Sequence, residues 1–365
     1  LISLLDQYDQ SQPFNLTDEQ RSAVLTTINS PVSLISGGAG TGKTSALRAL
    51  HDLCELAGKT ILQMALSGRA AMRMREATNR PAFTIASVLA RIKKKRLNLE
   101  LDTIILIDEA SMVDLSTLYR IFRFIPSHTK ICMVGDPMQL PPIGMGAPFH
   151  ELLRDASIPS VKLRRVMRQE DSTRIPAIAE GIRRGSLGHL PSFCGLQDGV
   201  SILPCPDNEI VSAVVDVFSQ MLGAGEVQMI SPLKSTVEAI NLSFHHSCAG
   251  KSHTSGYYLD EPVMWTYNDY RRDLVNGAMG TIKNIDSNNE ILARLDGVDH
   301  KLTFNDMADL VLAYAITVHK SQGSQWDRVI VPISKSRILD RSLAYTAITR
   351  AVKQVVIIGD VEALR

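Results

Sequence analysis

The chain has 365 residues, of which 45% are hydrophobic and 21% charged, and its formal net charge is +1. This composition is typical of a globular protein with a sizeable core, and the length suggests two or three domains. A membrane span is not expected, because no apolar run reaches about 18 residues. The chain opens on Leu1 without the pattern of a signal peptide, so we interpret it as a fragment or the ordered part of a longer protein.

The cysteines and the charge narrow the class of protein further. The five cysteines contain no Cys-x-x-Cys pair, so neither a disulfide framework nor a zinc site is expected. A reducing cytoplasm is the expected location. The near-zero net charge neither indicates nor excludes a nucleic-acid partner, because a strand can be held by a local basic channel.

Four short apolar runs in the first half predict buried parallel strands. Each run is followed by polar or acidic residues, as in sheets that carry functional side chains at the carboxyl ends of their strands. We therefore expect a first α/β lobe over residues 1–160. The runs are residues 31–36, 61–66, 103–107 and 130–134.

The first of these strands leads into a glycine loop and then into a helical pattern. The loop has the G-x-x-x-x-G-K-[ST] spacing, in which backbone N–H groups and a helix N-terminus surround phosphates. Lys43 is expected to reach the β- and γ-phosphates of ATP, and the Thr44 hydroxyl to bind Mg²⁺. The alternative is a glycine turn that merely precedes a helix. The residues assigned to ATP are Gly37, Gly38, Ala39, Gly40, Thr41, Gly42, Lys43, Thr44 and Ser45.

Two further strand ends carry candidate catalytic residues. Asp108 and Glu109 follow an apolar run; in P-loop enzymes the first carboxylate holds the Mg²⁺ shell, and the second is placed to act as general base on water. A helix cap is the alternative role for Asp108. Gln139 lies in Gly135-Asp-Pro-Met-Gln-Leu-Pro-Pro142, which by itself could equally be a proline-bounded loop.

Two segments predict insertions. The stretch over about 90–103 is basic and then alternating, and predicts a short hairpin. Residues 261–303 alternate between turn signals such as Asn276-Gly277, which predicts a small antiparallel β insertion, assigned to 251–303. It interrupts a second α/β lobe over 161–250 and 304–365. The strands expected where this lobe resumes are residues 310–315, 329–333 and 355–358.

At this point the motifs, in this order, resemble those of superfamily 1 helicases. The P-loop, Asp108-Glu-Ala-Ser111 and the Gln139 segment resemble motifs I to III. In the second half, the matching segments are Val166-Met-Arg168-Gln169 for motif IV, residues 317–324 for motif V and residues 344–351 for motif VI. Leu16-Thr-Asp-Glu-Gln20 resembles the glutamine motif that recognises adenine. Ser231-Pro-Leu-Lys234, Asn268-Asp-Tyr270 and Asn276-Gly-x-x-Gly280 are typical of the RecD branch.

The resemblance spans about residues 14–360 and implies a fold and an activity. The implied fold is two RecA-like P-loop lobes with parallel sheets, the second carrying an SH3-like β insertion. The implied activity is ATP-dependent 5′-to-3′ movement on single-stranded DNA with separation of duplex DNA. The expected partners are single-stranded DNA and duplex junctions, with no membrane; protein partners are unknown.

The resemblance also assigns roles around the nucleotide. Gln139 would sense the γ-phosphate, and Arg168 and Arg350 would act as arginine fingers. A bidentate guanidinium suits this role because it stabilises charge on the phosphoryl oxygens; the alternative for each arginine is a surface or ion-paired side chain. The remaining residues assigned to the nucleotide are Gln20, Gly323 and Gln325.

The expected nucleic-acid track comes from both halves. Ser67, Gly68 and Arg69 resemble motif Ia, while Thr317, His319, Lys320 and Ser321 of motif V suit phosphate contacts. His319 could instead be structural. Two positions depart from the family: Ala86 stands where a histidine is usual, and Gln325 where glutamate is frequent. The candidates for base stacking are Tyr267, Tyr270 and Trp326, although Trp326 could equally belong to the core.

The basic run Lys93–Arg96 leaves two interpretations open: part of a strand-separating hairpin, or a solvated basic turn. At the level of the whole chain, an RNA helicase of the same superfamily and a catalytically silent nucleic-acid-binding scaffold are the alternatives. Intact Lys43, Asp108 and Glu109 argue against the scaffold. Nuclease activity is not expected, because no separate carboxylate cluster is present.

Overall fold

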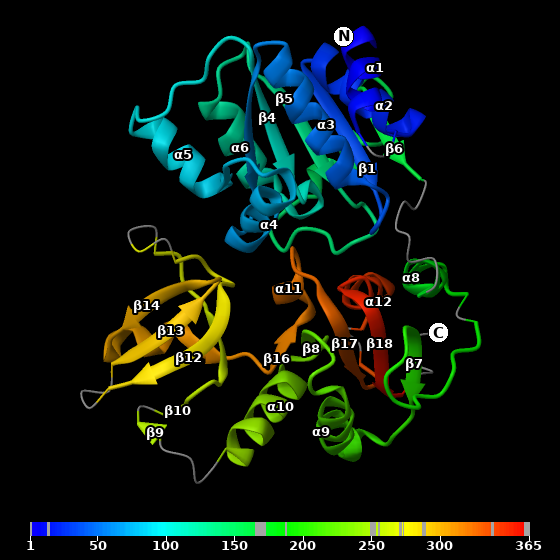
Figure 1. The fold of residues 1–365 in the computed structure, drawn as a ribbon, viewed down its shortest axis with the longest axis vertical. Helices are drawn as coiled ribbons and strands as arrows, with labels where there is room; N and C mark the ends of the chain where they lie inside the picture. The colour runs from blue at the N-terminus through cyan, green and yellow to red at the C-terminus, as the bar shows by residue number, and fades with distance from the viewer. Residues whose placement is uncertain are drawn as a thin grey trace. The chain divides into compact units, whose positions relative to one another are not determined.

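A computed structural model describes residues 2–12, 15–164, 173–186, 188–248, 253–254, 256–269, 272, 274–286, 290–336 and 339–360. The chain divides into two compact units, a first unit over Leu1–Gln169 and a second unit over Glu170–Arg365. Each contains a parallel sheet with helices (Figure 1), so the expected α/β class with two parallel-sheet lobes is confirmed. No described helix is both long and apolar enough to span a membrane.

The first unit is built on a six-stranded sheet in the order β3-β2-β4-β5-β1-β6. Every pair is parallel, which places the carboxyl ends of all six strands at one edge. The sheet extends past the expected boundary at residue 160, because the last strand pairs with β1. The strands are β1 Val32–Gly37, β2 Thr60–Ala65, β3 Ala82–Thr84, β4 Thr103–Asp108, β5 Lys130–Gly135 and β6 Ser160–Leu163.

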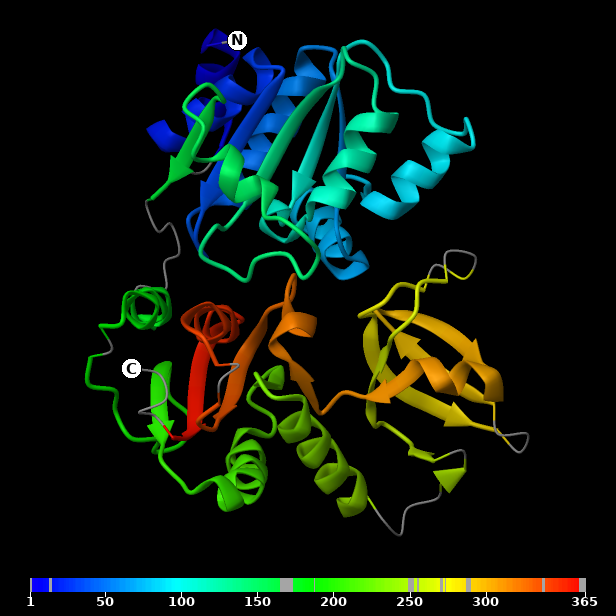
Figure 2. The same cartoon turned by 180° about the vertical axis from the view of Figure 1, so that it is seen from behind.

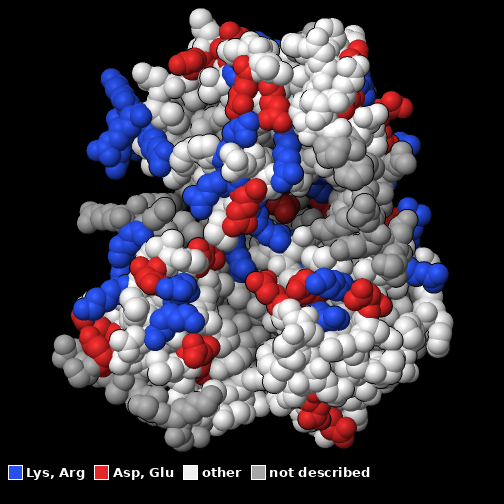
Figure 3. Space-filling model, viewed as in Figure 1, with Lys and Arg blue, Asp and Glu red and all other residues white. Residues whose placement is uncertain are grey.

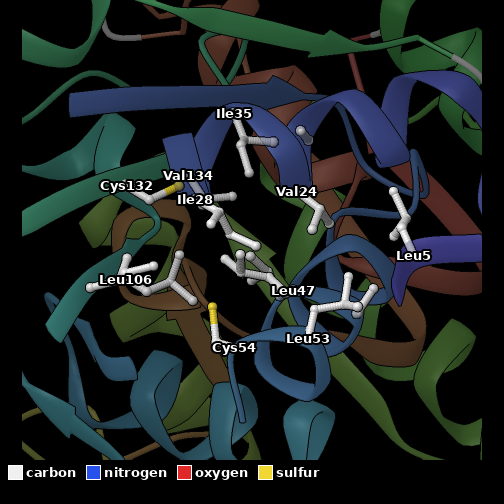
Figure 4. Close-up of a cluster of buried hydrophobic side chains, with 14 of the residues drawn as sticks. Leu5, Val24, Ile28, Ile35, Leu47, Leu53, Cys54, Leu106, Cys132 and Val134 are labelled. Carbon is white, nitrogen blue, oxygen red and sulfur yellow. The ribbon is translucent and has the colours of Figure 1, made fainter. Parts of the chain in front are cut away.

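Helices cover both faces of this sheet. On one face α1, α2 and α3 bury Leu5, Val24 and Leu47 against strand residues such as Ile35 and Val134, as Figure 4 shows. On the other face α5, α6 and α7 pack around Ile105 and Met133. The helices are α1 Ile2–Ser11, α2 Asp18–Asn29, α3 Lys43–Leu56, α4 Gly68–Thr78, α5 Ile85–Lys93, the short η1 Ala110–Met112, α6 Leu115–Phe124 and α7 Pro148–Leu152.

The hairpin expected over about 90–103 is not formed. Helix α5 continues to Lys93, and residues 94–102 form a turn and a loop without a strand before β4 begins. Leu97 and Leu99 pack against the core under α5 and α6. The alternation that suggested a strand therefore reflects a loop that buries every second side chain, and no partner strand is needed.

The second unit contains a five-stranded parallel sheet in the order β16-β8-β17-β18-β7. Its strands are β7 Gly199–Leu203, β8 Val227–Ser231, β16 Ala315–Thr317, β17 Trp326–Ile333 and β18 Ala351–Gly359. Its helices are α8 Ile175–Arg184, η2 Asp207–Glu209, α9 Ile210–Met221, α10 Lys234–Ser247, α11 Val318–Ser321 and α12 Arg341–Ile348.

A separate antiparallel sheet, here called the β module, spans Pro262–Leu312 in the order β14-β13-β12-β11-β15. The apolar run 310–315 was expected to open the parallel sheet, but Leu310–Leu312 pairs with β11 inside the β module, and the parallel sheet resumes only at β16. The SH3-like identity stays a prediction. The strands are β11 Pro262–Trp265, β12 Met279–Ile285, β13 Ile291–Leu295, β14 Val298–Leu302 and β15 Leu310–Leu312. A short helix, η3 Phe304–Asp309, precedes β15. A separate two-stranded sheet, β9 His253–Thr254 and β10 Tyr257–Tyr258, precedes the β module in the chain.

A buried carboxylate joins the β module to α10. Glu261, only 1% exposed, lies 2.8 Å from His245 Nδ1 and accepts hydrogen bonds from the Tyr314 hydroxyl (3.1 Å) and the Tyr258 backbone N–H (2.9 Å). Burial raises the pKa of Tyr314, so this hydroxyl remains a donor. One side chain therefore satisfies groups from α10, β10 and the segment before β16.

Replacing Glu261 with alanine is expected to destabilise the second unit by about 3 kcal/mol, because it leaves buried donors without an acceptor. The chain has two tryptophans, so a Trp326→Phe background makes buried Trp265 the fluorescent reporter of the β module during urea unfolding. Asp299→Ala, which breaks only the exposed pair with Arg294, is the matched control and should leave the midpoint unchanged. Equal midpoints for the two variants would contradict this role of Glu261.

Candidate functional site

The glycine loop between β1 and α3 has the backbone that a phosphate-binding loop requires. Gly40 and Gly42 have φ of 77° and 79°, a left-handed conformation that side chains other than glycine rarely adopt. A Cβ at Gly37 would lie 2.5 Å from Thr41 Oγ1, so this position is sterically closed to larger residues. The N-terminus of α3, with its unpaired N–H groups, opens directly onto this loop.

Lys43 and Gln20 are both held against the loop. Lys43 Nζ donates to the carbonyl oxygens of Gly37 (2.6 Å) and Gly38 (2.8 Å). Gln20 Nε2 donates to Gly42 O (3.0 Å), while Gln20 Oε1 accepts from the Thr17 N–H (2.9 Å) as part of the capping box of α2. Gln20 thus ties the start of α2 to the loop, and one Nε2 hydrogen and one Oε1 lone pair remain for a base.

The two carboxylates at the end of β4 have different surroundings. Asp108 Oδ1 accepts from the Glu109 N–H at 2.8 Å, and burial together with the Glu109 carboxylate raises the pKa of Asp108 to about 6. Glu109 has φ of 51° and its side chain caps no helix. The helix-cap alternative for Asp108 is not supported, because α6 is capped by Asp114, which accepts from the Thr117 N–H at 2.7 Å.

These side chains fit a nucleotide with a divalent cation. A carboxylate and a hydroxyl, as in Asp108 and Thr44, are the hard oxygen ligands that Mg²⁺ prefers. A nearby cation would also favour the ionised form of Asp108, which its burial disfavours.

Gln139 offers an unused polar atom at the end of β5. Its Nε2 donates to Asp136 Oδ2 (3.3 Å), but its buried Oε1 has no hydrogen-bond partner in the described part of the chain. The same holds for the buried Ser111 Oγ after β4. Strands β4, β5 and β1 are neighbours in the sheet, so the structure brings the P-loop, the two carboxylates and Gln139 to one edge.

The motif Ia residues follow β2, the strand next to β4. Ser67 caps α4 by accepting from the Ala70 N–H at 3.1 Å, and Gly68 and Arg69 form the first turn of that helix, all three half-buried. At the departure from the family pattern, Thr84 caps α5 through the Ser87 N–H (3.1 Å), and Ala86 lies within the helix.

In the second unit, motif V lies at the carboxyl end of β16. Thr317 accepts from the Lys320 N–H (3.4 Å) as the cap of α11, and His319 and Lys320 are exposed. Ser321 differs from the expectation, because it is fully buried and donates to Val318 O at 2.7 Å. It therefore stabilises α11, and its hydroxyl does not face solvent.

Lys234 is a candidate phosphate contact beside motif V to which the sequence analysis assigned no role, although it named the segment Ser231–Lys234. Ser231 ends β8 opposite Thr317 in the parallel register, and Lys234 begins α10 just beyond it. Partial burial and the charge of Lys234 lower the pKa of Lys320, so the two ammonium groups are near each other. The signal was available, since Lys234 is a basic residue three positions after an apolar strand run.

The remaining predicted residues fall into four groups. Arg350, 3% exposed, donates to Thr346 O (3.0 Å), Ser324 O (3.2 Å) and Thr349 Oγ1 (3.3 Å), so it joins motif VI to motif V within the second unit. Trp326 is 6% exposed and belongs to the core, whereas Tyr267 is 58% exposed. Gly323 has φ of 72° and Gln325 is half-buried. Arg168 and Tyr270 lie outside the described residues.

Two family models match the chain. One, described as an AAA domain, covers residues 15–194, and the other, described as a UvrD-like helicase C-terminal domain, covers residues 312–358. The first match contains the P-loop, the two carboxylates and Gln139. The second contains motifs V and VI.

Curated relatives include an ATP-dependent RecD2 DNA helicase of Deinococcus radiodurans, 29% identical over 92% of this chain and 48% of the relative. The RecBCD enzyme subunit RecD of Mycolicibacterium smegmatis is 28% identical over 94% of this chain and 71% of the relative. The chain thus spans about half the length of the Deinococcus protein.

Among solved structures, the fold is similar to that of Pif1 helicase from Bacteroides in complex with ADP-AlF3 and single-stranded DNA. The TM-score is 0.61 with 21% identity, and the match covers 93% of this chain and 92% of that one. A Pif1 helicase from Candida albicans gives a TM-score of 0.58 with 17% identity, over 96% and 97% of the two chains.

Proposed function

Because the chain belongs to the RecD-like helicases of superfamily 1, we propose that it hydrolyses ATP to move 5′ to 3′ along single-stranded DNA and separates duplex DNA at junctions. The observation that carries the proposal is the shared edge of β4, β5 and β1, which holds the P-loop, Asp108, Glu109 and Gln139. A scaffold without catalytic activity would not need the Gln139 Oε1 atom to be buried without a hydrogen-bond partner on the same sheet edge as two carboxylates.

Each residue has a role that its position suits. ATP with Mg²⁺ supplies the phosphoryl group and neutralises charge on it. Loop N–H groups and Lys43 hold the phosphates, Thr44 and Asp108 hold the cation, and Gln20 contacts the base. Glu109 orients the attacking water and accepts its proton, and Gln139 positions that water through its Oε1 acceptor or the γ-phosphate through its Nε2 donor. Arg350 and Arg168 act on the charge that develops during transfer.

The nucleic-acid contacts come from strand ends in both units. Thr317, His319 and Lys320, with Lys234 beside them, contact phosphates, as do Ser67, Gly68 and Arg69 of the first unit. Phosphate contacts position the strand without reading its sequence. The relative from Deinococcus is named as a DNA helicase, which is why DNA is proposed here as the substrate.

We expect single-stranded DNA to stimulate ATP hydrolysis, and the affinity for DNA to fall with salt by a log–log slope of about −0.7 per neutralised phosphate. Lys234→Ala and Lys320→Ala should each reduce that slope by about one such step, while Lys283→Ala, on the β module and paired with Asp260, serves as the control. Unwinding of 5′-tailed and 3′-tailed duplexes, in DNA and in RNA, tests polarity and substrate. Equal turnover with and without DNA would overturn the proposal.

A further inference from the structure

Helix α6 exposes aromatic side chains where an amphipathic helix should expose polar ones. Leu118 and Ile121 are buried against the sheet, but Leu115, Tyr119 and Phe122 are 51%, 61% and 47% exposed. Their i, i+4, i+7 spacing places them on one outer face of the helix. Grouped apolar side chains on a surface are characteristic of a binding site.

The apolar face continues onto the loop that follows Pro142. The Leu115 N–H donates to Met145 O at 3.0 Å, and a Cβ at Gly146 would lie 3.1 Å from Leu115 Cβ. Met145 and Ile143 are 81% and 84% exposed. The loop backbone therefore lies directly against the start of α6 and adds two further apolar side chains.

Unpaired cations accompany these aromatics. Arg120 and Arg123 alternate with Tyr119 and Phe122, are exposed, and form no ion pair with any described residue. Other arginines of the first unit, such as Arg21 and Arg80, are paired with carboxylates.

A second group of cations lies at the end of the neighbouring helix. Helices α5 and α6 pack side by side on one face of the sheet, as both ribbon views show (Figures 1 and 2). The run Lys93–Arg96 at the end of α5 is exposed, and none of its four residues has an ion-pair partner among the described residues. Figure 3 shows basic side chains projecting from this end of α5.

We propose that this basic–aromatic face binds a second segment of single-stranded nucleic acid, apart from the strand that motif V contacts. The face consists of Lys93–Arg96, Leu115, Tyr119, Arg120, Phe122 and Arg123. Its cations, which form no ion pair with a described residue, complement phosphates, and its exposed rings offer surfaces on which bases can stack. A duplex hides the faces of its bases, so the aromatics favour a single strand. The strand displaced at a junction has this chemistry.

The inference goes beyond the proposed motor, because binding to this face requires no ATP hydrolysis. The test compares a forked DNA carrying two single-stranded tails with a DNA carrying one tail, by fluorescence anisotropy. Tyr119→Ala with Phe122→Ala should weaken binding of the forked DNA by about tenfold, the effect of losing one stacked base. Binding of the singly tailed DNA and DNA-stimulated ATP turnover should change less than twofold.

Two further variants serve as a control for the loss of an exposed apolar side chain and as a test of the cations of this face. Leu56→Ala, the control, removes another exposed apolar side chain, at the end of α3, and should leave both DNAs bound as before. Arg120→Ala with Arg123→Ala should lower the salt dependence for the forked DNA alone. Unchanged binding of the forked DNA by the Tyr119 and Phe122 variant would overturn the inference. So would a variant that binds DNA normally but loses self-association in light scattering, because the face would then be a contact between copies of the chain.

Discussion

Replacing Glu109 with glutamine is expected to leave ATP binding intact and to lower ATP turnover by about 100-fold or more, the usual contribution of a general base. Glutamine keeps the shape of the side chain, so the left-handed backbone at this position (φ 51°) and the hydrogen bond from its N–H to Asp108 are retained. What is lost is the carboxylate that accepts a proton from water. Binding of a fluorescent ATP analogue and steady-state phosphate release measure the two effects separately.

Asp114→Asn is the matched control for this variant. Asp114 is a carboxylate in the same segment, but it caps α6 through the Thr117 N–H, and asparagine caps helices equally well. Its turnover should stay within twofold of the unmodified chain. Near-normal hydrolysis by the Glu109 variant would assign the base to another residue, and loss of ATP binding would show that Glu109 acts on the ground state.

Arg350→Ala should lower ATP turnover by about 10³-fold, the lower end of what an arginine finger contributes, because the developing phosphoryl charge loses its guanidinium. ATP affinity should fall by no more than about tenfold. Arg350→Lys should restore little, since a point charge does not reproduce the planar fork. Single-turnover hydrolysis and equilibrium ATP binding distinguish these outcomes.

The structure adds a second expected effect of the same change. Arg350 donates to Ser324 O and Thr346 O, so alanine also removes hydrogen bonds inside the second unit, at a cost of about 1–3 kcal/mol. Arg328→Ala is the control, because Arg328 donates to Ala224 O and to Gln354 in the same unit but belongs to no motif. If Arg350→Ala hydrolyses ATP at the normal rate, the finger assignment fails and Arg168 is the remaining candidate.

The sequence by itself determined the features that depend on neighbouring residues. The glycines of the loop before Lys43 specify left-handed backbone at Gly40 and Gly42, and the apolar runs specify strands whose ends carry Asp108 and Gln139. The strand positions were accurate because a buried strand, like a glycine-rich turn, is a local pattern.

Tertiary structure decided the features that depend on distant partners. Leu310–Leu312 has the composition of a core strand, but it joins the β module because β11 offers a free edge there. Residues 94–102, whose apolar and polar side chains alternate, form a loop because Leu97 and Leu99 pack against the core under α5 and α6. Trp326 and Ser321 became buried, and Lys234 came near Lys320, through strand pairing far along the chain. Periodicity reports which side chains are buried, but which strand or helix covers them is set by packing between segments distant in sequence.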